Sequence, residues 1–175
     1  MRRDQLEHLI RAAGALLGED RIVVIGSQAI LATFPDGLPA PAVASVEADL
    51  LPLDDPDGEK ALEISGNMGE ASRFQETHGV YADGVEPGTA RLPAEWEARL
   101  IPICNENTNG VTGFCLEAYD LCASKLLAGR HKDFVFCDAL LAGGHLDPSI
   151  VRVRIPYTNA SHDERRRIAG FLDRY

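Results

Sequence analysis

The residues that could carry chemistry in this sequence begin with a glycine–serine pair at the end of a short apolar segment. Gly26 and Ser27 follow RIVVI, and Ser27 begins the segment SQAILATF, which has helical character. A glycine at a strand-to-helix turn lets a ligand approach the backbone, and the N–H groups at a helix start hold phosphate. The alternative is that Ser27 is only a helix N-cap. Taken alone, the pair favours the N-cap interpretation.

Two carboxylates stand about twenty residues farther along, the spacing at which an acidic residue follows many glycine turns. Glu47 and Asp49 lie within the apolar segment ASVEADLLPL. Side chains two apart on a strand share one face, so both carboxylates would project together as a ligand set for Mg²⁺ or Mn²⁺. A solvated edge strand explains an isolated pair equally well. Here the apolar flanks favour a buried strand, where an unpaired charge is costly, and a cation is expected nearby.

A third carboxylate, Asp83, stands in the apolar segment HGVYADGV. If that segment is a neighbouring strand of the same sheet, Asp83 adds a ligand to the metal site of Glu47 and Asp49. Asp83-Gly84 is also a strong turn signal. A metal ligand and a turn residue therefore remain two open alternatives for Asp83.

Apolar periodicity predicts the elements that must position these residues. Leucine, isoleucine and alanine recur at helical spacing over about residues 3–17, and Gly18 would end that helix. The chain then reads as strands and helices in an α/β part, residues 1–116, followed by a helical part, residues 117–175. Strands are expected at 21–26, 44–53, 78–85 and 100–104, a loop at 35–42, a turn at 105–110, and helices at 27–34, 55–65, 116–129, 131–145, 147–155 and 161–175, with a helical turn at 92–100.

Length and charge limit the class of protein. A chain of 175 residues forms one ordinary domain with room for a small appendage. No apolar run approaches the roughly 20 residues that span a bilayer, so we expect a cytoplasmic protein with no membrane partner. The formal net charge of −10 argues against general coating of nucleic acid. Local basic sites remain open at Arg130-His131-Lys132, Arg152/Arg154 and Arg165-Arg166-Arg167.

The order of these motifs resembles the minimal nucleotidyltransferase fold, in which a glycine-rich turn leads to a strand with paired acids and then to a later strand acid. Gly26-Ser27, Glu47-Ala48-Asp49 and Asp83 follow that order. The segment SKLLAGRHKDFVF, with Trp96-x-x-Arg99-Leu100 ahead of it, looks like the bacterial branch of AbiEii-like and MenT-like nucleotidyltransferase toxins. The resemblance spans roughly residues 21–144.

This resemblance implies a mixed sheet with a C-terminal helical appendage and a Mg²⁺-dependent or Mn²⁺-dependent transfer of a nucleoside monophosphate from an NTP to a hydroxyl. It implies that Glu47, Asp49 and Asp83 hold the metal and that Asp49 is catalytic. Gly26, Ser27, Arg130 and Lys132 would bind nucleotide. Lys125 would bind triphosphate as a point charge, and Asp133 would orient or deprotonate the acceptor hydroxyl.

The implied acceptor is RNA, such as a tRNA 3′ end, or a protein, and the implied cellular role is the toxin of a toxin–antitoxin pair with a cognate antitoxin as partner. The acidic net charge is awkward for an enzyme that modifies tRNA. Two rival functions stay open: a non-catalytic module that binds a nucleotide or a protein, and an enzyme that transfers phosphate instead of nucleotide. Convergence of Glu47, Asp49 and Asp83 on one point would favour catalysis.

Overall fold

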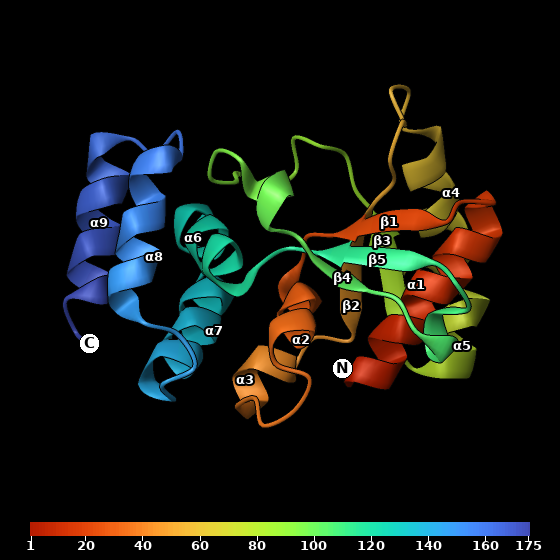
Figure 1. Cartoon of the computed structure of the whole chain (residues 1–175), viewed down its shortest axis with the longest axis horizontal. Coiled ribbons are helices and arrows are strands. Elements are labelled where there is room, and N and C mark those ends of the chain that lie inside the picture. Colours follow the sequence, from red (N-terminus) through yellow and green to blue (C-terminus); the bar gives the residue numbers. More distant parts are fainter.

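A mixed five-stranded sheet forms the centre of the computed structural model, which describes all residues 1–175. Its strands are β1 (Arg21–Val24), β2 (Glu47–Leu51), β3 (Tyr81–Gly84), β4 (Ile101–Ile103) and β5 (Thr112–Cys115), in the spatial order β3-β2-β1-β5-β4. β1 runs antiparallel to β2 and parallel to β5, while β2 and β3 are parallel and β4 and β5 are antiparallel (Figure 1). The predicted α/β fold with a mixed sheet is confirmed.

One face of this sheet is packed against helices from the first half of the chain. α1 (Arg3–Leu17), α4 (Glu59–Met68) and α5 (Arg73–His78) lie together at this side of the molecule (Figure 1). Apolar side chains that alternate along the strands are fully buried here, among them Ala48 and Leu50 of β2. Their burial fixes the orientation of β2, because its alternate residues must then point to the opposite face.

The opposite face of the sheet carries both the acidic residues and a small apolar cluster. Glu47, Asp49 and Leu51 alternate with the buried Ala48 and Leu50 along β2. Leu51 joins Val23 and Ile25 in a separate buried cluster, against which Trp96 and Phe114 pack. The chain from residue 85 to residue 100 crosses this side, and its 3₁₀ helix η2 (Trp96–Arg99) supplies the tryptophan.

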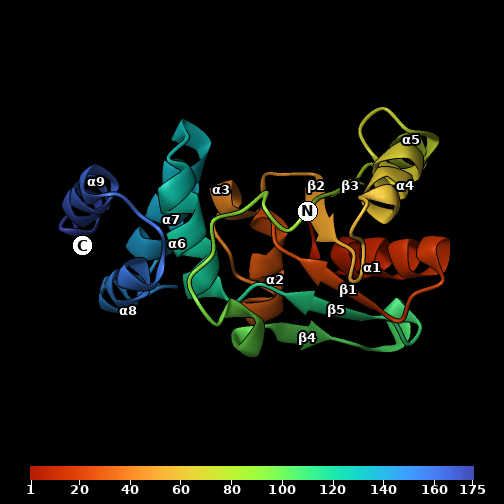
Figure 2. The same ribbon diagram turned by 90° about the horizontal axis from the view of Figure 1, so that it is seen from above.

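Helices alone follow β5, as the sequence periodicity predicts. They are α6 (Ala118–Ala128), α7 (His131–Ala142), α8 (Pro148–Arg154), the 3₁₀ helix η4 (Ile155–Tyr157) and α9 (His162–Leu172). Figures 1 and 2 show them grouped at the side of the sheet away from α1, α4 and α5. One continuous core of 37 buried residues nevertheless includes side chains from the sheet, from α1 and from these helices, so the two parts are packed as one body.

A buried aspartate on α6 further connects the helical part to the front of the chain. Asp120 is fully buried, and its carboxylate lies 2.7 Å from Arg99 Nε of η2 and 3.1 Å from Arg154 Nε of α8. A buried carboxylate is stable only when it is paired in this way. Asp120 therefore holds η2 and α8 in place beside α6.

Several short elements differ from expectation, among them the helix α5 (Arg73–His78), which no expected element covers. The predicted helix at 27–34 is a 3₁₀ turn, η1 (Ser27–Ala29), continued by α2 (Ile30–Thr33). The predicted loop at 35–42 ends in a short helix, α3 (Ala40–Val43), with Pro41 in its first turn, where proline is well tolerated. The turn at 105–110 contains a 3₁₀ helix, η3 (Glu106–Thr108), capped by Asn105. None of the helices is both long and apolar enough to cross a membrane.

Candidate functional site

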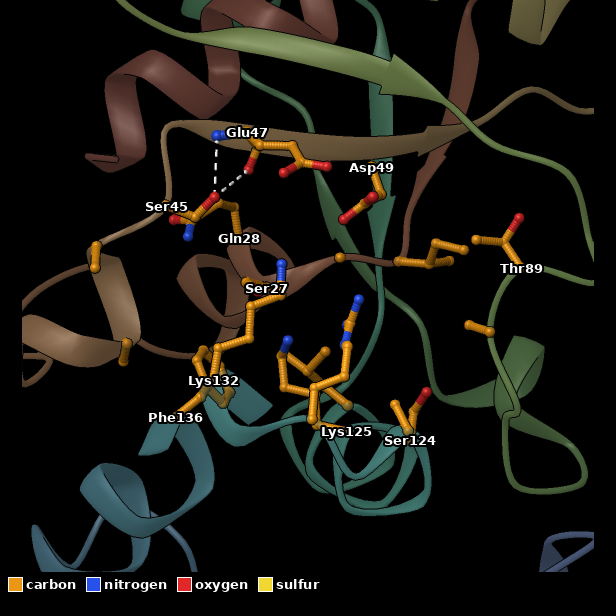
Figure 3. A pocket seen from close by; sticks show the side chains of 18 of the residues that line it. Ser27, Gln28, Ser45, Glu47, Asp49, Thr89, Ser124, Lys125, Lys132 and Phe136 are labelled. Carbon is orange, nitrogen blue, oxygen red and sulfur yellow. Dashed lines mark hydrogen bonds between the residues drawn. The ribbon is translucent and has the colours of Figure 1, made fainter. Parts of the chain in front are cut away.

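A cavity of about 600 Å³ opens between the acidic face of the sheet and the first two helices of the helical part (Figure 3). Its upper wall is formed by Gly26, Ser27, Glu47 and Asp49. Its lower wall comes from α6 and α7 and includes Lys125, Arg130, Lys132 and Phe136. Residues of α3 and of the segment 89–91 line the remaining sides. Every nucleotide-binding residue predicted from the sequence lines this one cavity.

The Gly26-Ser27 turn lies directly against the acidic strand. Ile25 N donates a hydrogen bond to Asp49 O at 3.1 Å, which brings the end of β1 beside β2. A β-carbon at residue 26 would overlap the Asp49 carboxylate, so only glycine fits there. Gly26 is the N-cap of η1, and Ser27 is its first residue, whose hydroxyl makes no hydrogen bond. The N-cap interpretation of Ser27 is therefore wrong, and its side chain faces the cavity (Figure 3).

Glu47 and Asp49 point from β2 into the cavity, as the strand periodicity predicts (Figure 3). Burial and the neighbouring Glu47 carboxylate raise the pKa of Asp49 to about 6, against the opposing effect of Lys125. Glu47 also accepts a hydrogen bond of 3.3 Å from the Tyr81 hydroxyl. Burial together with the Glu47 charge raises the pKa of that hydroxyl to about 12. The carboxylates of Glu47 and Asp49 are thus held close together, and the positive charge that the protein places near them does not fully offset their repulsion.

Asp83 lies in β3 directly opposite Asp49 in the parallel register. It is therefore a strand residue and not a turn residue. Burial, the charges of Glu47 and Glu70, and a side-chain interaction with Glu47 raise its pKa. Asp83 does not line the cavity, and its Oδ1 lies 3.3 Å from the position that a β-carbon of Gly69 would take.

The three predicted carboxylates lie on adjacent strands but are not gathered into a ready-made ligand set, so a shared metal site stays a prediction. No group of three or more histidine, cysteine, aspartate or glutamate side chains lies close enough together to hold one metal ion. Ionised carboxylates repel one another when no cation lies between them, and Asp83 sits one strand farther from the cavity than its two partners. Glu47 and Asp49 remain as the pair that faces the cavity.

Lys125 is a buried residue and not a solvated lysine on a helix surface. It projects from α6 into the cavity, with only 8% of the residue exposed. Its Nζ lies 3.3 Å from Asp133 Oδ1 and 4.7 Å from the centre of the Phe136 ring. A buried ammonium group held by one aspartate and one ring has hydrogen-bond donors left for a further anionic partner.

Asp133 holds the cations of the lower wall and does not itself face the cavity. Its side chain is fully buried at the start of α7, where it accepts hydrogen bonds from Arg130 Nε at 2.7 Å and from Lys125 Nζ at 3.3 Å. Burial alone would raise its pKa, but the Arg130 and Lys125 charges lower it overall. Both carboxylate oxygens are occupied by these cations, and the predicted action of Asp133 on an acceptor hydroxyl stays a prediction. In this structure Asp133 holds Lys125 and Arg130 in place.

Several cavity residues carried no signal in the sequence. Arg91 lines the cavity from an irregular segment and is fixed by Glu164 of α9, 73 residues away in the chain, at 2.6 and 3.0 Å. Gln28 is fully buried beside the cavity, and neither polar atom of its amide has a hydrogen-bond partner. Such long-range partners belong to no local motif. The only sequence signal for Arg91 is its place as a basic residue in a loop that contains proline and glycine.

The donor set on β2 fits a hard divalent cation. Two adjacent carboxylates supply the oxygen ligands that Mg²⁺ and Mn²⁺ prefer, and Mg²⁺ characteristically completes its shell with water and substrate phosphate. The raised pKa of Asp49 reflects a repulsion that a bound cation would relieve. Glu47 and Asp49 are therefore the residues of this chain that would hold the metal.

This mixed sheet, with a glycine turn pressed against paired strand acids and basic helices across a cavity, defines a protein of the nucleotidyltransferase fold. The chain belongs to the family described as nucleotidyltransferase of unknown function (DUF6036), which it matches over residues 4–172. The match supports the general class and is coarser than the AbiEii-like and MenT-like branch. No curated protein and no solved structure matches the chain significantly.

Proposed function

We propose that this chain transfers a nucleoside monophosphate from an NTP to a hydroxyl acceptor, with Mg²⁺ or Mn²⁺ as cofactor. One observation carries the proposal: paired carboxylates on β2 face the basic residues of α6 and α7 across a single cavity (Figure 3). At about 600 Å³ the cavity has the size of typical small-ligand sites. A metal-bound triphosphate carries both the positive charge that the acids need and the negative charge that the basic residues need.

The basic residues would bind the triphosphate. Lys125 is held by Asp133 at a fixed position, which lowers the entropic cost of using it as a phosphate ligand. Arg130 and Lys132 flank it at the start of α7. Ser27 adds an unengaged hydroxyl, and the close approach of Gly26 to the acids brings the phosphates beside them.

Glu47 and Asp49 would hold the metal against the phosphates. When bound, a divalent cation stabilises the negative charge that develops on the transferred phosphorus and its leaving group. The chain itself orients the phosphates through Lys125 and Arg130, and Asp133 keeps both cations in place. Positioning and electrostatic stabilisation are the main contributions that a protein makes to transfer at phosphorus.

Two other functions from the sequence remain alternatives to this proposal. A non-catalytic module would keep the cavity and bind the nucleotide without transfer, and the absence of Asp83 from the cavity lining favours that alternative. A phosphotransferase would use the same residues on the γ-phosphate. The role of a toxin paired with an antitoxin stays a prediction from the resemblance, as does a tRNA acceptor.

Transfer assays with two labels separate these functions. Purified protein is incubated with Mg²⁺, RNA, protein lysate and each of the four NTPs, labelled at either the α-phosphate or the γ-phosphate. Transfer of the α label by the wild type, with none by Asp49→Asn, is the expected result. Transfer of the γ label alone would identify a phosphotransferase. NTP binding with no transfer of either label would identify a non-catalytic module.

A further inference from the structure

A second hollow of about 910 Å³, here called the acidic groove, lies on the same face of the sheet as the carboxylates. Its floor is a row of apolar side chains across three neighbouring strands: Phe114 of β5, Val23 of β1 and Leu51 of β2. Trp96 forms a wall. Val23 and Leu51 are almost fully buried, so the accessible apolar surface of the groove is formed mainly by the half-buried Phe114 and Trp96.

The groove begins where the carboxylate site ends. Leu51 follows Asp49 by two residues and shares its face of β2, which places the two residues about 7 Å apart along the strand. Asp49 lines the cavity and Leu51 lines the groove. A molecule seated in the groove could therefore present a reactive group to the carboxylate site without crossing the basic cavity.

The two hollows have opposite charge. All charged residues lining the groove are acidic: Asp54, Asp55 and Glu97. Asp54 and Glu97 are exposed and make no ion pair or side-chain hydrogen bond, whereas Asp55 accepts from the backbone N–H groups of Lys60 and Ala61. The nearby Lys60 ammonium donates to Glu19 at 2.6 Å and to the Leu53 carbonyl at 3.0 Å, and it forms no ion pair with a rim carboxylate, although Asp54 and Asp55 lie near enough to help raise its pKa. In the first cavity, by contrast, Lys125, Arg130 and Lys132 face the two acids.

The stereochemistry of the proposed reaction predicts that the two hollows, with their opposite charges, bind different substrates. Displacement at phosphorus places the attacking and leaving oxygens roughly in line, on opposite sides of the transferred group. The basic residues that would hold the leaving pyrophosphate lie in the first cavity, on the helical side of the acids. The attacking hydroxyl then enters from another direction, and the groove is the hollow that adjoins Asp49 along β2.

We propose that the acidic groove binds the acceptor, and that the acceptor is a basic polypeptide segment carrying a serine, threonine or tyrosine hydroxyl. This inference rests on the proposed function. The hydroxyl oxygen forms a bond to the α-phosphorus, the bond between the α-phosphorus and the bridging oxygen breaks, pyrophosphate leaves, and the hydroxyl proton passes to water. Lysine or arginine side chains pair with Asp54 and Glu97, while apolar side chains pack on Phe114 and Trp96.

The same features disfavour RNA as the acceptor. Protein surfaces that bind RNA pair basic side chains with phosphates and stack bases on aromatic rings. Trp96 could stack a base, but the three rim carboxylates would repel the adjoining phosphates. The formal net charge of −10 adds to that repulsion at long range.

Peptide binding to purified full-length protein tests the groove directly. The probe is a fluorescent twelve-residue peptide in which lysines and leucines flank one serine, compared with the same peptide carrying glutamates and with a twelve-nucleotide RNA. The test variant is Asp54→Asn/Glu97→Gln. The matched control is Asp57→Asn/Glu95→Gln, which removes the same charge from exposed residues outside the groove.

We expect the basic peptide to bind the wild type and to bind the test variant about three- to tenfold more weakly, with a salt dependence that the variant loses. The control variant should change peptide affinity less than twofold, and NTP affinity should be equal in all three proteins. The inference is overturned if the test and control variants behave alike, if the acidic peptide binds as well as the basic one, or if the test variant weakens binding of RNA.

The transfer assay distinguishes failure of the peptide acceptor from failure of the proposed nucleotidyltransferase reaction. With α-labelled NTP, the wild type should label the serine peptide, and the test variant should label it with a raised KM for peptide and an unchanged KM for NTP. Labelling of RNA alone would overturn the peptide acceptor but leave the nucleotidyltransferase standing. Peptide binding that depends on Asp54 and Glu97, with no transfer to any acceptor, would overturn both the transfer reaction and the acceptor role.

Discussion

Gly26 lies so close to Asp49 that a β-carbon at residue 26 would overlap the Asp49 carboxylate. The contact is reinforced by the hydrogen bond from Ile25 N to Asp49 O at 3.1 Å. The glycine turn and the acidic strand, which are separate motifs in the sequence, are therefore one structural unit. Gly26 has an ordinary negative φ of −80°, so lack of space and not backbone conformation requires glycine here.

Gly26→Ala should displace the Asp49 carboxylate and abolish metal-dependent NTP binding. Inserting a methyl group into a packed site costs about 1–3 kcal/mol of stability, so the variant should still fold at a lower melting temperature. The control is Gly66→Ala in α4, where a new β-carbon meets no atom within 4 Å. Calorimetric titration with NTP checks both proteins. Wild-type affinity in Gly26→Ala would show that the turn does not constrain the acids.

Asp49→Asn should stabilise the metal-free protein at neutral pH. The folded pKa of Asp49, about 6, lies above its ordinary value of 3.8. Protonation therefore favours the folded state, and this contribution is fully present below about pH 4 and is lost as the pH rises through about 6. The difference of about two pKa units sets an upper limit near 3 kcal/mol.

Thermal unfolding across pH 4–8 measures this effect. The melting temperature of Asp49→Asn should exceed that of the wild type at pH 7–8, and the two should converge near pH 4. Asp57→Asn, at an exposed position outside both hollows, serves as the control and should show no such pH dependence. A destabilised Asp49→Asn protein at pH 7 would mean that the carboxylate forms a structural ion pair.

The sequence predicts most of the fold because its elements are encoded locally. α1 begins and ends within the expected segment, and Gly18 ends it in the left-handed conformation with φ of 68°. Glu47 and Asp49 share a face because apolar neighbours fix the alternation of β2. The helix α3 was missed because Pro39 and Pro41 indicate a loop unless it is known that Pro39 is the N-cap and Pro41 lies in the first helical turn.

Lys125→Ala should weaken NTP binding strongly and reduce stability by about 1–2 kcal/mol, because a buried cation is lost while Arg130 still pairs with Asp133. Lys125→Arg should rescue NTP affinity only in part, since a planar guanidinium replaces a point charge. Parallel titrations with NTP and thermal melts measure the two effects. NTP affinity equal to wild type in Lys125→Ala would remove this residue from the site.

Asp133→Asn tests whether Asp133 positions Lys125 and Arg130 or removes a proton from the acceptor hydroxyl. Because Asp133 holds Lys125 and Arg130 and does not face the cavity, its loss should raise the KM for NTP about tenfold or more through the two released cations, a change of roughly 1.4 kcal/mol. The basic limb of the pH–rate profile should stay where it is. A large fall in kcat with an altered pH profile and unchanged KM would instead assign Asp133 to deprotonation of the acceptor.

The sequence could not predict those contacts in the site that join residues far apart in the chain, because only the tertiary fold brings such residues together. The sequence indicates that Lys125 lies on a helix but not that it is buried, which follows from the packing of α6 against α7 and places it between Asp133 and Phe136. Asp83 lies beside Asp49, as expected of a neighbouring strand, but its orientation toward Gly69 depends on how α4 packs. Arg91 enters the cavity through its pairing with Glu164, which only the tertiary fold brings near.

Glu47 and Asp49 are proposed to bind a divalent cation together with an NTP held by Lys125. Calorimetric titration of the wild type and of Glu47→Gln/Asp49→Asn with a non-hydrolysable NTP, with and without Mg²⁺, tests this proposal most directly. The wild type should bind the NTP at least about tenfold more tightly with Mg²⁺, because the cation joins the acids to the phosphates, and the double variant should lose that dependence. Equal NTP affinity in the wild type with and without Mg²⁺ or Mn²⁺ would contradict the account.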